Sequence, residues 1–162
     1  MYNLLFVDDD PWILEGMKEI VNWNLLSFNP PFVAGNVEEA KAIFRNVSVH
    51  ILITDIEMIG NSGFDLLSWV NSAYPGTLSA FLTCHARFDF AQQAINLGVF
   101  GYLLKPLQEQ ALTDILKKCL QRLDSNHEGN APEADKPHYS ETIEKAIEFI
   151  QKNLGSPLTR ES

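Results

Sequence analysis

The stretch Leu4-Leu5-Phe6-Val7-Asp8-Asp9-Asp10-Pro11 joins four apolar residues to three acids and a proline. An unbroken apolar run of this length is typical of a strand that is buried on both faces of a sheet. Pro11 is favoured at the first position of a helix, and Asp10 before it is a suitable N-cap. The stretch therefore predicts a buried strand that turns directly into a helix, with Asp8 and Asp9 at the turn.

The same alternation of strand-like and helix-like segments continues along the chain. Strands are expected at residues 4–7, 32–35, 51–54, 80–83 and 100–104. Apolar residues at helical spacing follow each of these runs. Such alternation is typical of an α/β protein, and right-handed crossovers make it an open, doubly wound sheet of five parallel strands. Ligands of such sheets bind at the carboxyl ends of the strands.

Composition limits the possible functions. A chain of 162 residues is long enough for one well-packed domain and too short for two full-sized ones. The net charge of −9 argues against a free-standing nucleic-acid binder. Cys84 and Cys119 have no metal-binding or redox spacing and suit reduced thiols. Because no transmembrane or signal-peptide pattern is present, we expect a soluble, cytoplasmic protein with no membrane partner.

The alternation breaks after residue 124. Residues 125–138 contain two prolines and a glycine and almost no apolar side chain, which predicts a linker. Residues 139–162 then return to helical spacing and predict a helical tail, whose apolar stripe is Ile143, Ile147, Ile150 and Leu154. An isolated helix of this length is marginal in water, so we expect the tail to pack against a second copy in a homodimer.

Polar residues fall where the expected strands end. Asp8 and Asp9 follow the first strand, and Asp55 follows the third. Thr83 ends the fourth strand, and Lys105 follows the fifth. All five should project from one edge of the sheet, where the carboxylates would repel one another unless a hard cation such as Mg²⁺ binds them. One carboxylate could then accept a phosphoryl group that the lysine and the hydroxyl stabilise.

Four motifs carry a resemblance to a known family. They are Leu5-Phe6-Val7-Asp8-Asp9-Asp10-Pro11, Asp55-Ile56-Glu57-Met58 followed by Gly63, Leu82-Thr83, and Tyr102-Leu103-Leu104-Lys105-Pro106. In this order and spacing, they resemble the receiver domains of two-component response regulators over residues 1–124. The resemblance implies a flavodoxin-like (βα)5 fold with strand order 2-1-3-4-5, and a signalling switch rather than an enzyme.

The resemblance also implies roles for individual residues. Asp55 would accept the phosphoryl group from a sensor histidine kinase, and Lys105 would pair with the phosphoryl oxygens. Mg²⁺ would be bound by Asp9, Asp55 and the backbone carbonyl of Glu57, with Asp8 acting largely through water. Thr83 would be drawn toward the phosphate.

We expect further positions to modify this site. Tyr102 would be the second member of the switch pair with the threonine, its ring turning inward. Glu57 and His85 lie two positions beyond the acceptor and the switch threonine, and both should overhang the phosphoryl group and alter its lifetime. Cys84 stands where a smaller residue is usual and would narrow access to the phosphate. Ile59 stands where many receivers have proline, which predicts a less rigid loop.

Rival readings remain at this point. The Asp8-x-Asp10 pattern resembles the haloacid dehalogenase-type phosphohydrolases, but that reading leaves Asp9 and Asp55 unexplained. A flavin-binding module of the same topology would need a phosphate loop in place of the three acids. Residues 143–159 resemble the opening of an AraC-type helix-turn-helix domain. That resemblance implies a transcription regulator cut short, which would contact DNA only through the part that is missing.

Overall fold

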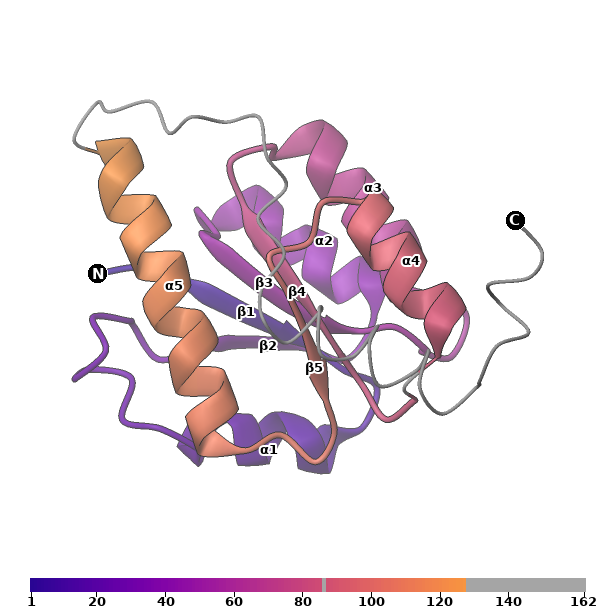
Figure 1. Ribbon diagram of the computed structural model, residues 1–162, viewed down its shortest axis with the longest axis horizontal. Coiled ribbons are helices and arrows are strands. Elements are labelled where there is room, and N and C mark those ends of the chain that lie inside the picture. Colours follow the sequence, from indigo (N-terminus) through magenta and orange to yellow (C-terminus); the bar gives the residue numbers. More distant parts are fainter. Residues whose placement is uncertain (86, 128–162) are drawn as a thin grey trace.

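The structure, a computed structural model, describes residues 1–85 and 87–127. Its five strands are β1 (Leu4–Val7), β2 (Phe32–Ala34), β3 (Ile51–Asp55), β4 (Leu78–Thr83) and β5 (Gly101–Leu104). They form one parallel sheet in the order β2-β1-β3-β4-β5 (Figure 1). The expected doubly wound fold class and strand order are confirmed.

The helices lie on both faces of this sheet. They are α1 (Pro11–Glu19), α2 (Val37–Asn46), α3 (Gly63–Ala73), α4 (Phe88–Asn96) and α5 (Glu109–His127). Helices α1 and α5 cover one face, and α2, α3 and α4 cover the other (Figure 1). Strands β1 and β3 are buried along their whole length, as the unbroken apolar runs predicted.

The register of the strands decides where their ends meet. Val7 at the end of β1 pairs with Thr54, and Asp55 pairs with Leu82 in β4. Thr83 in turn pairs with Leu104, which immediately precedes Lys105. The polar residues that follow the strands therefore stand in one row along the carboxyl edge of the sheet.

Helix α5 corrects one expected boundary. The linker was expected from residue 125, but α5 continues to His127. The Ser125 hydroxyl donates to the Gln121 carbonyl at 2.8 Å, one turn earlier, and no glycine or proline interrupts the chain before residue 129. The rest of the expected linker and the expected tail helix lie outside the described residues. Within residues 1–85 and 87–127, no helix is both long and apolar enough to cross a bilayer.

Candidate functional site

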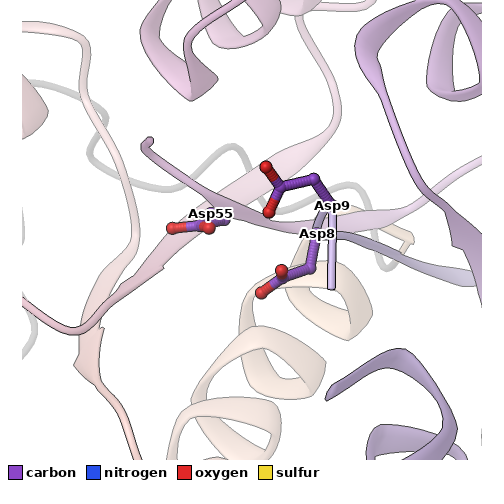
Figure 2. Close-up of side chains that lie close together, drawn as sticks. All are labelled: Asp8, Asp9 and Asp55. Atoms are coloured by element: carbon purple, nitrogen blue, oxygen red, sulfur yellow. The ribbon is translucent and has the colours of Figure 1, made fainter. Parts of the chain in front are cut away.

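Three carboxylates meet at the carboxyl edge of the sheet. Asp8 and Asp9 follow β1, and Asp55 ends β3; Figure 2 shows the three side chains together. One oxygen from each lies within 4.8 Å of the others. Asp8 and Asp55 are buried, with 3% and 7% of their surface exposed. The sequence therefore predicted correctly which acids would come together.

Lys105 supplies the positive charge of this group. Its Nζ lies 2.6 Å from Asp8 Oδ2 and 3.3 Å from Asp55 Oδ2. Only the contact with Asp55 has the geometry of a hydrogen bond. Asp8 Oδ2 is buried and lies close to the ammonium, but no donor among the described residues makes a hydrogen bond to it. The other oxygen of Asp8 accepts the Asp10 N–H at 2.9 Å. Asp8 Oδ2 therefore retains capacity for a further cationic partner.

The surroundings shift the pKa values of Asp55 and of Lys105. Burial raises the pKa of Asp55, and the nearby charge of Asp8 raises it further, while Lys105 opposes both effects. Burial lowers the pKa of Lys105, but the close contacts with the negative charges of Asp8 and Asp55 outweigh this effect, so that its pKa is raised overall. The lysine is therefore a permanent cation beside a carboxylate whose charged form is disfavoured.

These residues fit a magnesium ion. The group offers carboxylate oxygens alone, which suit a small, hard cation, and its excess negative charge favours a second positive charge. Asp9 is oriented by the backbone N–H of Ile59, which donates to Asp9 Oδ2 at 3.0 Å. A proline at position 59 has no N–H to give, so the departure from the usual family residue adds a hydrogen bond to the site.

Thr83, His85 and Tyr102 are joined by hydrogen bonds. The Thr83 hydroxyl is buried at the end of β4 and accepts the His85 N–H at 3.2 Å. The Tyr102 hydroxyl donates to the His85 carbonyl at 3.1 Å, and the tyrosine is fully buried. Burial raises the pKa of Tyr102 far above its ordinary value, so the hydroxyl keeps its proton. The buried Tyr102 ring therefore points into the protein core.

A group of ionisable side chains, here called the charged rim, consists of Glu57, His85, Arg87 and Asp89. His85 Nε2 lies 3.2 Å from Glu57 Oε2, and Arg87 Nη1 lies 3.9 Å from Glu57 Oε1. The sequence pointed to Glu57 and His85 as residues beside the site, but not to their mutual contact and not to Arg87. The available signal was a basic residue four positions after the switch threonine in a chain of strongly acidic composition.

Cys84 and Lys105 share a hollow of about 480 Å³ between α1 and the loop that precedes α5. Cys84 is exposed, so its expected effect on access to the phosphate stays a prediction. The peptide bond between Lys105 and Pro106 is cis. Asp10 is the expected N-cap of α1: its Oδ1 accepts the Trp12 N–H at 2.9 Å. Because the Asp10 carboxylate caps this helix, it is less available for the phosphohydrolase role that the Asp8-x-Asp10 pattern suggested.

The family can now be assigned. A family model described as "response regulator receiver domain" matches residues 4–117. The chain belongs to the response regulator receiver family. Receiver domains are signalling proteins that in general interact with a histidine kinase and bind Mg²⁺ at an acidic pocket. The haloacid dehalogenase alternative finds no support.

Similar proteins agree with this assignment. The receiver is 34% identical over 123 residues to the uncharacterized transcriptional regulatory protein YesN of Bacillus subtilis, covering 76% of this chain and 33% of YesN. It is 30% identical over 123 residues to the transcriptional regulatory protein HptR of Staphylococcus aureus, covering 76% of this chain and 48% of HptR. The chain thus spans about a third to a half of these curated relatives.

A solved structure shows the same fold. The receiver domain of AraT, a response regulator from Geobacillus stearothermophilus, is 28% identical with a TM-score of 0.71. The match covers 78% of this chain and 98% of that one.

Proposed function

We propose that this receiver is a phosphorylation-dependent switch in which Asp55 accepts a phosphoryl group from a sensor histidine kinase with the help of Mg²⁺. One observation carries the proposal: Lys105 contacts both Asp8 and the proposed acceptor Asp55, two buried carboxylates in an otherwise acidic group. Such an arrangement holds a nucleophilic carboxylate beside the charge that an incoming phosphoryl group needs.

The transfer step follows from these positions. An oxygen of the Asp55 carboxylate forms the new bond to phosphorus while the bond from phosphorus to the donor histidine nitrogen breaks. The released imidazole keeps the bonding electron pair and takes up a proton. Lys105 pairs with the phosphoryl oxygens and the Thr83 hydroxyl donates to one of them, so charge that develops in transfer is stabilised by groups already in place.

The metal would be held by Asp8, Asp9 and Asp55, with the backbone carbonyl of Glu57 as a further ligand. When bound, Mg²⁺ neutralises the carboxylates and the incoming phosphoryl oxygens. Asp9 is set for this role by its hydrogen bond from Ile59. The chain itself turns over no substrate in this proposal, since the phosphoryl group remains on Asp55 until water removes it.

The signal would pass through the hydrogen-bonded chain from Thr83 to Tyr102. Movement of the Thr83 hydroxyl toward the phosphate shifts the His85 N–H that donates to it, and the His85 carbonyl holds the Tyr102 hydroxyl. The threonine and the tyrosine are therefore proposed as the switch pair, with His85 as the residue between them.

The output is proposed to be transcription regulation. YesN and HptR carry the words "transcriptional regulatory protein" in their names, and this chain spans at most half of either. Residues 1–124 are proposed as the receiver unit and residues 139–162 as the start of a helix-turn-helix domain. DNA contact would then need the missing remainder, and dimerisation would present two copies of it.

The test is intact-mass analysis after incubation with Mg²⁺ and a small acyl phosphate. One phosphoryl group should add to the wild type, and chelation of the metal should prevent it. Asp55→Asn should also prevent it, whereas Asp10→Asn, which changes only the cap of α1, should be labelled normally. Labelling of Asp55→Asn at the wild-type rate would refute the proposal.

A further inference from the structure

The charged rim joins three segments that lie apart in the chain. Glu57 belongs to the loop after β3, His85 to the loop after β4, and Arg87 and Asp89 to the start of α4. Arg87 binds Asp89 in a bidentate manner, with Nε at 3.1 Å from Oδ1 and Nη2 at 2.8 Å from Oδ2. Its Nη1 faces Glu57 at 3.9 Å. Arg87 therefore stands between two carboxylates.

The pairs that hold Arg87 are easy to exchange. The side chains of Glu57, Arg87 and Asp89 are 49%, 53% and 54% exposed. Ion pairs at this exposure contribute little to stability because water screens them. A more strongly charged partner that arrives nearby should therefore displace them.

A phosphoryl group on Asp55 would be such a partner. Glu57 follows Asp55 by only two residues, just beyond the bend at Ile56, so the charged rim begins in the same loop that leaves Asp55. The phosphoryl group carries about −1.5 to −2 charges, so it repels the Glu57 carboxylate and attracts the guanidinium that now faces it. The planar fork of arginine also matches two phosphoryl oxygens at once.

We propose that Arg87 is a phosphoryl-binding residue that Glu57 and Asp89 hold in reserve until Asp55 is phosphorylated. On phosphorylation, the guanidinium leaves Glu57 and pairs with the phosphoryl oxygens, alongside Lys105. This inference rests on the proposed function of Asp55 and adds a second cation to the site.

The position of Arg87 gives the exchange a structural consequence. Arg87 is the N-cap residue of α4, so its backbone belongs to the start of the helix while its guanidinium is paired with Asp89 and Glu57. Its guanidinium carbon lies 4.3 Å from the centre of the Phe90 ring, which is buried against the core. Movement of the guanidinium therefore acts directly on the first turn of α4.

The test is the lifetime of the phosphoryl group on Asp55, followed by intact mass after the donor and Mg²⁺ are removed. Arg87→Gln should shorten the lifetime by roughly three- to tenfold, the size expected for a partly exposed charge-assisted contact. Arg87→Lys should lie between that variant and the wild type, because it keeps the charge without the fork. Arg45→Gln, which removes an arginine of α2 that stacks on Trp69, should leave the lifetime unchanged.

Two further variants distinguish phosphoryl binding by Arg87 from an effect of Arg87 on the structure of α4. Asp89→Asn releases Arg87 from its bidentate pair, so the lifetime should equal or exceed that of the wild type. Glu57→Gln should lengthen the lifetime in the wild-type background and have no effect when Arg87 is already glutamine.

An unchanged lifetime in Arg87→Gln would overturn the inference. So would an Asp89→Asn lifetime as short as that of Arg87→Gln, since Arg87 would then act only through the structure of α4. If the wild type takes up no phosphoryl group at all, the proposed function fails instead.

Discussion

The Lys105 ammonium lies 2.6 Å from the Asp8 carboxylate, closer than its 3.3 Å approach to Asp55. Asp8 is almost fully buried, so this contact is the main compensation for its charge among the described residues. The lysine thus occupies the place that a divalent cation would also seek. Metal and lysine should therefore compete for the same oxygen atoms.

Replacement of the lysine should make stability depend on the metal. Lys105→Gln leaves the Asp8 charge uncompensated, and the free energy of unfolding should fall by roughly 1–3 kcal/mol in metal-free buffer. Mg²⁺ should then raise the thermal midpoint of this variant more than that of the wild type, because a ligand stabilises the state that binds it more tightly. Lys41→Gln, on α2, is the matched control. Equal responses to Mg²⁺ in Lys105→Gln and wild type would contradict the competition.

The acceptor should make stability depend on pH. Burial, assisted by Asp8, raises the pKa of Asp55 in the folded state above its ordinary value. The stability that this group contributes is therefore present at low pH and is lost as pH rises through the folded-state pKa. Asp55→Asn cannot ionise, so in metal-free buffer at neutral pH it should be more stable than the wild type. The difference should shrink as pH falls toward the ordinary carboxyl range.

Urea unfolding of both proteins across a pH series measures this difference. The prediction fails if the difference in unfolding free energy stays constant with pH, or if Asp55→Asn is less stable than the wild type at neutral pH. Either result would show that burial does not dominate the pKa of Asp55.

The loop after β3 should influence metal affinity through a single backbone group. Ile59→Pro removes the N–H that donates to Asp9 Oδ2, and Mg²⁺ should then bind several times more weakly because Asp9 is no longer oriented. Ile59→Ala keeps the N–H and loses only a side chain that is 90% exposed, so its affinity should match that of the wild type. Calorimetric titration with Mg²⁺ compares the three proteins. Equal weakening in both variants would assign the effect to the side chain.

Glycine at position 63 should be required for the geometry of the acceptor. A Cβ on Gly63 would overlap the backbone carbonyl oxygen of Asp55, so Gly63→Ala should cost roughly 1–3 kcal/mol of stability and slow phosphorylation of Asp55. A Cβ on Gly16, within α1, meets nothing within 4 Å. Gly16→Ala should therefore stabilise the protein by roughly 0.5–1 kcal/mol. Chemical unfolding measures the stability of both variants. A Gly63→Ala variant as stable as the wild type would contradict the prediction.

Much of the site could be predicted because parallel topology brings strand ends together. Strands β1, β3, β4 and β5 each end in a polar residue or are followed directly by one, so the sequence predicts Asp8, Asp55, Thr83 and Lys105 on one edge of the sheet. The cap by Asp10 was also predictable, since it depends on residues that are neighbours in the chain. The end of α5 was misjudged because polar residues continue a helix when no glycine or proline stops them.

The local amino-acid sequence thus determined the strands, the residues at the strand ends and the cap of α1. Tertiary structure alone decided that Lys105 lies closer to Asp8 than to Asp55, that Ile59 orients Asp9, and that Arg87 faces Glu57. The reason is physical. Strand and cap formation depend on residues adjacent in sequence, whereas these contacts depend on the path of loops and the rotamers of side chains that only the folded chain brings within a few ångströms.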